Sequence, residues 1–273
     1  MATIAEYNEY GRVLEEKFKL RYAPVAFKML WEGDEIPEDC PRVLDRLGKR
    51  LAMCQAFSYV RRNRRAITLL AEDHWCVWPL ACFKIFELDE DDYQVMGTKL
   101  FIRDAEKSVQ FFKEKYPWLE CNGKKPLGFS LAPLDTCSFV PDIIVTYCRV
   151  SQLRGMVKAF KMETGELIPQ TLDTIASCSY CTIPMLNGQK YAVTLPDPGE
   201  YERALAEEDE IIFSVRGDEL PNVMSGMKRL AAIPFGYSDL HFDMNLEFPR
   251  AQFYDDMAKK WGLKTGAIWK MGE

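Results

Sequence analysis

Apolar and polar positions alternate along the chain in segments of helical and of strand-like spacing. Residues 4–18 place apolar side chains three and four positions apart, which predicts a helix, and the short apolar run 24–31 predicts a strand. The same spacings continue through the first half of the chain. They predict further helices near 44–57, 79–88 and 104–116, and strands at 66–70 and 99–103.

The second half follows the same order of elements. Strands are predicted at 127–134, 142–148, 191–195 and 210–215, and helices after Ser151, around 172–179, after Gly217 and around 251–261. The sequence therefore predicts an α/β to α+β fold with a mixed sheet, built from two related strand-helix-strand halves. The expected divisions are an N-terminal half (1–120), a C-terminal half of the same domain (121–231) and a helical C-terminal extension (232–273).

The two halves resemble each other closely enough to suggest an internal duplication. Pro24 and Pro141 each open a strand, and Cys54 and Cys178 each lie on a predicted helix before a strand. Any chain that alternates strands and helices shows some resemblance of this kind. The alternative to an internal duplication is therefore a simple repetition of element types. A true duplication predicts a pseudo-twofold axis, with a ligand cleft between the halves that Cys54 and Cys178 both face.

Composition narrows the class of protein. The chain has 273 residues, of which 48% are hydrophobic and 28% charged, as in a globular protein with its own core. No apolar run approaches the ~18–20 residues that span a bilayer, and the acidic N-terminus does not resemble a signal peptide, so we expect a cytoplasmic protein without a membrane partner. The net charge of -6 argues against nucleic acid as a partner. Self-association into a homo-oligomer stays open.

Nine cysteines are the most informative feature of the composition. The odd number and the absence of an export signal argue against a disulfide framework. Cys178 and Cys181 are three residues apart, and Cys76 and Cys82 flank the start of a predicted helix, where a thiolate is favoured. We predict that Cys54, Cys76, Cys82, Cys178 and Cys181 surround a cofactor, with Cys54, Cys76, Cys82 and Cys178 as its ligands. Four thiolates suit a [4Fe–4S] cluster or zinc. The competing interpretation is buried cysteines with packing roles and no metal.

A second candidate is the segment from His74 to Trp78. His74 and Cys76 are two residues apart, so in an extended segment they point to the same side and could form a catalytic imidazole–thiol pair. Trp75 and Trp78 would then shield a bound substrate from water. The alternative is a loop that plugs the core, with His74 hydrogen-bonded to backbone.

Two further segments suggest anion binding. The run Arg61, Arg62, Arg64 and Arg65 offers guanidinium groups to an oxyanion, and we predict Arg61 and Arg65 as substrate ligands. The alternative is a helix end paired with Glu72, Asp73 or the acids at 89–92. The segment 196–200 leads into a helix and can bring the backbone at Gly199 to an anion, or it can be only a rigid turn.

Together these segments resemble a known family, the prokaryotic proteins called domain of unknown function 169. The resemblance covers about 15–230. It is carried by the strand 24–28, Cys54-Gln55 on a helix ending in basic residues, the segment 69–73 leading to Cys76, the segments 133–134 and 141–145, and Ser177-Cys178 followed by a Leu195–Gly199 loop. Family members often have Cys-x-Gly after the second strand and a cysteine near the Pro-Gly loop, where this chain has Val77-Trp78 and Asp197-Pro198. The resemblance implies a cytoplasmic prokaryotic protein with cysteine-centred sites and supplies no reaction.

Two functional hypotheses follow. The first is an enzyme or accessory redox protein that holds a thiolate-ligated centre, an iron–sulfur cluster or a metal, and acts on a small molecule in the cleft between the halves. The second is a metal-free module that binds a small anion or regulates through it. The chain lacks the glycine-rich nucleotide loops, the HExxH zinc motif and the GxSxG hydrolase motif. Only two histidines are present, which excludes a histidine-rich metal centre.

Overall fold

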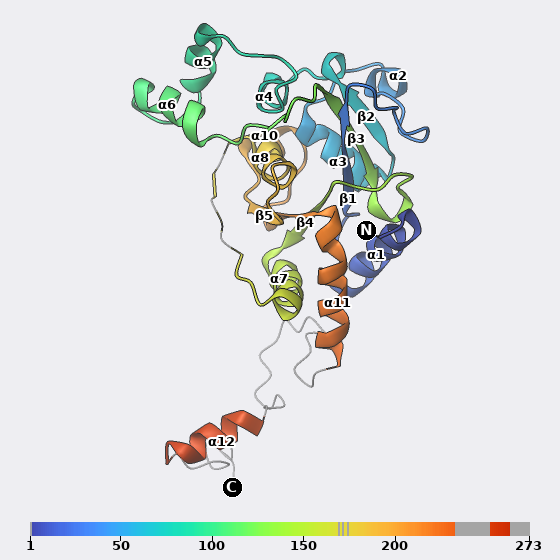
Figure 1. Cartoon of the computed structure of the whole chain (residues 1–273), viewed down its shortest axis with the longest axis vertical. Coiled ribbons are helices and arrows are strands. Elements are labelled where there is room, and N and C mark those ends of the chain that lie inside the picture. The colour runs from blue at the N-terminus through green and yellow to red at the C-terminus, as the bar shows by residue number, and fades with distance from the viewer. Residues whose placement is uncertain (1, 169, 171, 174, 233–251, 263–273) are drawn as a thin grey trace.

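The computed structural model describes residues 2–168, 170, 172–173, 175–232 and 252–262. Within these residues six strands form one sheet in the order β2-β3-β1-β4-β6-β5 (Figure 1). The strands are β1 (Val25–Trp31), β2 (Ile67–Leu70), β3 (Pro126–Pro133), β4 (Ile143–Arg149), β5 (Tyr191–Thr194) and β6 (Glu210–Arg216). Helices pack on both faces, which confirms the predicted α/β to α+β class.

Every pair of neighbouring strands in the sheet is antiparallel, so the expected mixed sheet was wrong. The cause is the place of the third strand in each half, where the halves are now β1 to β3 and β4 to β6, because β3 lies beyond the expected division at 120/121 but pairs with β1 and β2. β1 and β2 are joined through helices and run in the same direction, but β3 lies between them and pairs antiparallel with both. β6 lies between β4 and β5 in the same way. Each half is therefore a split β-α-β unit, in which the parallel strands never touch.

The strand order is unchanged when β1, β2 and β3 are exchanged with β4, β5 and β6. The two halves meet at a short antiparallel pairing in which Ala26 lies opposite Ile144. The helices follow this repeat less closely. The helix after β4 packs on the opposite face of the sheet from the helices between β1 and β2. The topology therefore repeats, while the internal duplication stays a prediction.

Alternate side chains of each strand enter two separate cores. Phe27 and its neighbours on one face pack with Phe129, at 5.2 Å between ring centroids, and with Phe83. Ala26 and Ile144 point to the other face. This period of two follows from the pleat of a strand, and both sets of side chains are buried because helices cover both faces of the sheet.

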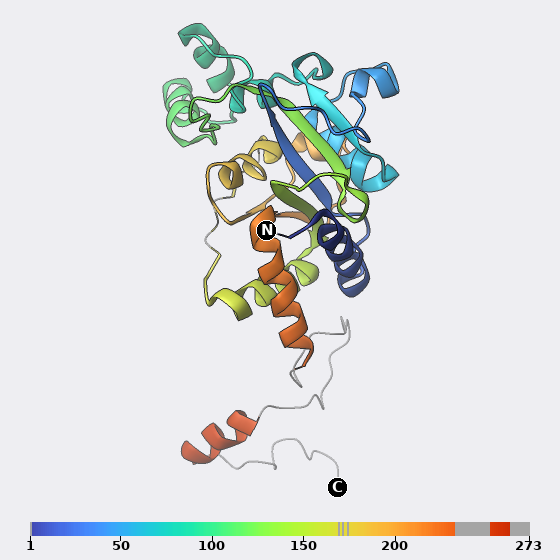
Figure 2. The same ribbon diagram turned by 45° about the vertical axis from the view of Figure 1, so that its right-hand side comes forward.

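The helices divide between the two faces (Figures 1 and 2). On the face of Phe27 lie α2 (Val43–Leu47), α3 (Met53–Asn63), α4 (Val77–Cys82), α6 (Ala105–Lys115), α8 (Ser177–Tyr180) and α9 (Ile183–Leu186). α5 (Glu90–Gly97) packs on α6, and α10 (Pro198–Arg203) packs on α3. On the opposite face lie α1 (Ile4–Phe18), α7 (Val150–Thr164) and α11 (Leu220–Ala231). Short 3₁₀ turns occupy Ala71–Asp73, Leu134–Thr136 and Gly217–Glu219.

Four predicted elements differ from the structure. The helix expected near 44–57 is two helices, α2 and α3, because Gly48 ends α2 in a left-handed conformation with φ of 62°. The strand at 99–103 was wrong: these residues form turns between α5 and α6, and Phe101 is 82% exposed. The helix expected over 79–88 ends at Cys82, since Lys84 takes a left-handed conformation with φ of 51°. The helix expected around 172–179 begins only at Ser177.

The C-terminal helix is confirmed as α12 (Gln252–Lys260), while 233–251 and 263–273 of the predicted extension lie outside the described residues. Among the helices described, each is too short or too polar to cross a membrane.

Candidate functional site

The five predicted cofactor cysteines all lie on the face of the sheet that carries α3, α4 and α8. Cys54 is on α3, Cys76 precedes α4 and Cys82 ends it, Cys178 is on α8 and Cys181 follows it. All five are free thiols, and only Cys76 is more than slightly exposed. The fold has thus brought to one region cysteines from three distant segments of the chain.

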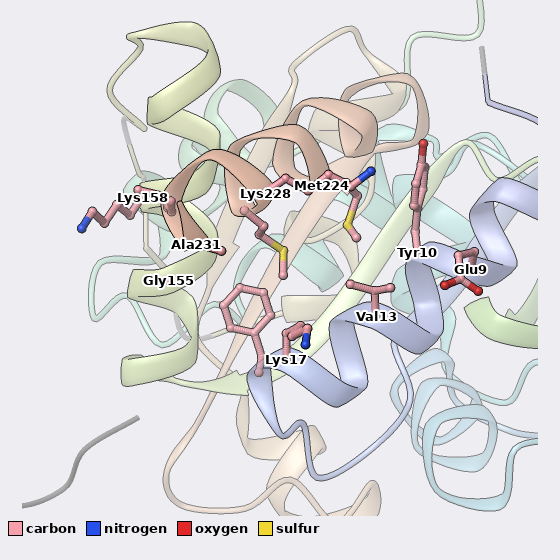
Figure 3. A pocket seen from close by; sticks show the side chains of 12 residues that line it. Glu9, Tyr10, Val13, Lys17, Gly155, Lys158, Met224, Lys228 and Ala231 are labelled. Atoms are coloured by element: carbon pink, nitrogen blue, oxygen red, sulfur yellow. The ribbon is translucent and has the colours of Figure 1, made fainter. Parts of the chain in front are cut away.

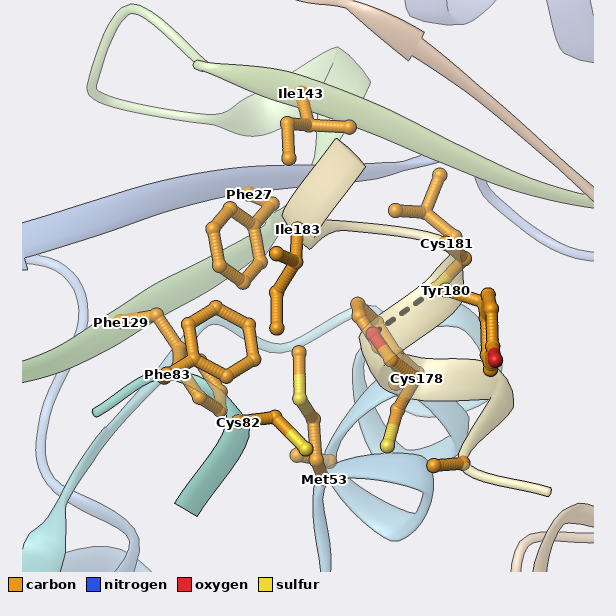
Figure 4. Packing of buried hydrophobic residues seen from close by; sticks show 14 of the residues in the cluster. Phe27, Met53, Cys82, Phe83, Phe129, Ile143, Cys178, Tyr180, Cys181 and Ile183 are labelled. Carbon is orange, nitrogen blue, oxygen red and sulfur yellow. Dashed lines mark hydrogen bonds between the residues drawn. The ribbon is translucent and has the colours of Figure 1, made fainter. Parts of the chain in front are cut away.

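Four of these thiols form a connected group. Cys54, Cys76 and Cys178 lie within electrostatic range of one another, and Cys82 lies within range of Cys76. Figure 4 shows Met53 between the side chains of Cys82 and Cys178 at the edge of the aromatic core. Among the described residues, no three or more His, Cys, Asp or Glu side chains stand close enough to hold a single metal ion. The thiols are neighbours, and their role as ligands stays a prediction.

Burial keeps these thiols protonated at neutral pH in the metal-free protein. It raises the pKa of Cys82 to about 12 and that of Cys178 well above its ordinary value. The pKa of Cys76 is also raised by burial, although a hydrogen bond from the Trp78 backbone and the Arg203 guanidinium both oppose the increase. The predicted preference for a thiolate at this helix start was therefore wrong for both cysteines. At Cys76 desolvation outweighs the Trp78 hydrogen bond, and Cys82 lies at the end of α4.

His74 and Cys76 do not form a catalytic pair in the structure. The imidazole is buried and meets the Phe129 ring edge-on, with 5.3 Å between centroids. Burial lowers the pKa of His74 to about 4, so the ring is neutral at physiological pH. Neither ring nitrogen has a hydrogen-bond partner within the described part of the chain. The arrangement resembles the alternative interpretation, in which this loop fills part of the core. The nucleophilic role of Cys76 stays a prediction, and His74 does not act as its base in this structure.

The two tryptophans have different surroundings. Trp75 is 45% exposed beside the cysteines, donates from Nε1 to Gln55 Oε1 at 2.9 Å, and lies under the Arg203 guanidinium at 5.2 Å. Trp78 instead packs into an aromatic cluster with Phe112, at 5.6 Å between centroids. Trp75 is thus the partly exposed tryptophan beside the cysteine region, and Trp78 belongs to the aromatic core.

The loop before α10 fastens α8 to α3. Asp197 caps α10 by accepting from the Glu200 N–H at 3.0 Å, and its second oxygen accepts from the Ser177 N–H at 2.9 Å. The Gly199 carbonyl accepts a weak hydrogen bond from the Cys54 thiol at 3.8 Å. The Asp197 carboxylate therefore occupies the position that an anion was predicted to take at this helix start, and the structure gives Gly199 a contact with Cys54.

Glu200 is a candidate functional residue that the sequence pattern did not single out. Its side chain is fully buried, and Oε1 accepts from the Tyr147 hydroxyl at 2.8 Å and from Ser177 Oγ at 3.3 Å. Oε2 has no hydrogen-bond partner in the described structure. Burial, and then the charge of Asp197, raise the pKa of Glu200 to about 7. A carboxyl group with this pKa can accept and release a proton at physiological pH.

Other buried polar atoms without partners surround the same region. The Ser179 and Ser214 hydroxyls lack a hydrogen bond of normal geometry to any described residue, as does the Tyr116 hydroxyl. Ser179 faces Cys82 and Ser214 faces Cys181, and each favours the thiolate of its cysteine. Ser179 and Ser214 are thus the polar side chains next to the buried thiols of Cys82 and Cys181.

The arginine run is a structural network instead of an open anion site. The Arg61 side chain is fully buried and donates to Glu210 at 2.7 Å. Arg62 pairs with Glu207, and Arg64 pairs with Glu15 and Asp135. The acids proposed as alternative partners were wrong: Glu72 and Asp73 pair with Arg42. The network holds the end of α3 to the segment before β6, and Arg65 remains exposed to solvent.

The match to a known family covers most of this architecture. The profile for domain of unknown function 169, described as "Uncharacterised ArCR", matches residues 13–226. The chain belongs to the domain of unknown function 169 family. The matched region includes all five cysteines of the site as well as Asp197 and Glu200. No curated protein and no solved structure matches the chain, so the family assignment defines a relationship without a reaction.

Proposed function

We propose that the chain binds a thiolate-ligated iron–sulfur cluster through Cys54, Cys76, Cys82 and Cys178 and acts as a redox enzyme or accessory redox protein on a small molecule. The observation that carries the proposal is the convergence of these four thiols from α3, α4 and α8. The Ser179 hydroxyl, which faces Cys82, can donate a hydrogen bond of the kind that thiolate-ligated centres receive from their surroundings.

The described thiols are not gathered as tightly as a single zinc ion requires. A tetrahedral zinc ion with Zn–S bonds of about 2.3 Å requires its sulfur atoms to lie about 3.8 Å apart. No described group of His, Cys, Asp and Glu side chains is gathered this tightly. A four-iron cluster binds each thiolate through a different iron, so its ligands stand farther apart. Its iron atoms would supply one-electron chemistry when bound.

The chain's own residues have separate tasks in this proposal. Each thiol loses a proton on ligation, and Glu200 can hold one of those protons at Oε2 because its pKa is near 7. The Arg203 guanidinium lies close enough to Cys54 and Cys76 to favour their thiolates. Trp75, partly exposed beneath Arg203, offers an aromatic surface next to a cation beside the cysteines, which suits a planar or anionic substrate.

The test is anaerobic loading of the full chain with ferrous iron and sulfide, followed by analysis of both elements and an absorption spectrum. We expect a brown protein whose iron and sulfide content falls by more than half in Cys54→Ser, Cys76→Ser and Cys178→Ser. Cys148→Ser is the matched control, because Cys148 is equally buried but lies in the core on the opposite face. The proposal fails if the protein stays colourless, or if Cys148→Ser loses as much iron as Cys54→Ser.

The same preparation tests a second function, a metal-free module that binds a small anion. Arg203 above the exposed Trp75 is the observation that favours it, since the arginine run itself is engaged in ion pairs. A colourless protein whose melting temperature rises with added carboxylate or phosphate, and does not rise in Arg203→Gln, supports this second function and excludes the first.

A further inference from the structure

A cavity of about 470 Å³ lies on the opposite face of the sheet from the cysteines, between α1, α7 and α11 (Figure 3). Its walls are largely apolar and are formed by Val13, Phe18, Met224, Met227 and Leu230. The volume falls within the range of about 300–1,000 Å³ that is typical of sites for small organic ligands. Two methionines in the wall can adapt to the shape of a flexible chain.

The rim of this cavity is positively charged. Lys17 on α1 and Lys228 on α11 border it, together with Lys158 on α7. The acidic side chain at the rim is Glu9, which pairs with Arg12 at 2.9 Å. An apolar interior beneath lysines is complementary to a molecule with an apolar chain and an anionic head.

Gly155 keeps the cavity open. A Cβ atom at this position would lie 2.5 Å from the Phe18 ring. Without a side chain on α7 at this point, the ring rests against the helix backbone. A larger residue would push the ring toward the space between the helices.

We infer that this cavity binds a single-chain amphiphile with an anionic head group, a medium- or long-chain carboxylate. The chain lies among Phe18, Met224 and Leu230, and the carboxylate meets Lys17 and Lys228. The site is separate from the cysteine region, because the sheet stands between the two cores. The inference is therefore independent of the proposed iron–sulfur function.

The test is calorimetric titration of the full chain with octanoate, decanoate and dodecanoate below their micelle concentrations. Burial of each added methylene is expected to tighten binding about fourfold. Dodecanol and dodecyltrimethylammonium, which carry the same chain without the negative charge, are expected to bind more weakly than dodecanoate.

Two variants locate the site. Ala231→Trp places a large side chain at an exposed lining position and is expected to weaken dodecanoate binding at least tenfold without affecting folding. Lys17→Glu/Lys228→Glu is expected to weaken dodecanoate while leaving dodecanol unchanged. Lys161→Glu, on α7 but outside the lining, is the charge control.

Three results would overturn the inference. They are affinity that does not depend on chain length, equal binding by Ala231→Trp, and binding to anionic vesicles without binding to monomeric dodecanoate. The last result would assign the lysines to a membrane surface.

Discussion

Removing the Arg61 guanidinium should destabilise the protein more than removing any exposed arginine of the same run. Arg61→Met keeps the apolar stem and deletes the charge. In the native protein Arg61 donates to Glu210 at 2.7 Å, with exposed side-chain fractions of 0% and 2%. The guanidinium also lies 4.0 Å from the Tyr147 ring centroid. The variant therefore leaves the Glu210 carboxylate buried without its cation.

The magnitude follows from desolvation. Breaking a buried ion pair by removing one partner costs about 3–5 kcal/mol of folding free energy, because the remaining charge is uncompensated. The double variant Arg61→Met/Glu210→Gln removes both charges. The Gln carbonyl oxygen can still accept from the Glu207 N–H, which in the native protein donates to Glu210 Oε2 at 2.9 Å. The double variant should recover about half or more of the loss. Arg65→Met, at an exposed position, should change stability by no more than about 0.5 kcal/mol.

Equilibrium urea unfolding followed by tryptophan fluorescence measures these differences, provided that the slope against urea is unchanged among the variants. An Arg61→Met protein within about 1 kcal/mol of the native protein would refute the structural role. It would return Arg61 to the set of candidate anion ligands. A double variant as unstable as the single one would show that the loss does not come from the stranded carboxylate.

Two further predictions concern buried groups. Because the pKa of Glu200 is raised from 4.5 in the unfolded chain to about 7 in the fold, its ionisation should remove about 3 kcal/mol of stability as pH rises from about 4.5 to 7. Urea unfolding at pH 5 and pH 8 should show this loss in the native protein but not in Glu200→Gln; an equal pH dependence in both would contradict it. Gly226→Ala should destabilise, since its Cβ would lie 1.8 Å from the Ala159 carbonyl oxygen on α7. Overpacking of about 1–3 kcal/mol exceeds the gain of about 1 kcal/mol from helix propensity. Ser225→Ala is the control, and a stabilised Gly226→Ala would refute the clash.

Local sequence patterns predicted best those strands that are buried on both faces of the sheet. β1, β4 and β6 lie where short apolar runs placed them, because a strand between two cores carries apolar side chains on both of its faces. The sequence of a strand does not show in the same way which other strand it pairs with. The insertion of β3 between β1 and β2 joins residues about sixty positions apart, such as Thr68 and Ser130. The order of elements along the chain therefore predicted a mixed sheet, whereas neighbouring strands in the structure all pair antiparallel.

The candidate site also has features that the sequence predicts and features that it does not. Cysteines are conspicuous in a sequence, and their neighbourhood on α3, α4 and α8 could be anticipated from spacing and from a presumed cleft. The environments of Glu200 and Arg61 could not. Arg61 is buried because Glu210, 149 positions away, compensates its charge, and no pattern around residue 61 contains that information. A run of arginines looks the same in sequence whether it meets solvent, a ligand or distant carboxylates.

The position of the cysteine region follows from how the two halves are joined. Backbone pairing between them is short: it joins Val25, Ala26 and Phe27 to residues 143–145, with one more hydrogen bond from the Asp142 N–H to the Phe27 carbonyl at 2.9 Å, so side chains must supply most of the remaining contacts. On the cysteine face those contacts run from α3 to the C-terminal half. Cys54 meets Gly199, and Arg61 meets Glu210. The thiols of α3 and α4 therefore approach those of α8 only when both halves are folded and docked. Ligation across this junction would add a link where the backbone pairing is short, so loading with iron and sulfide should stabilise the docked state as well as supply chemistry.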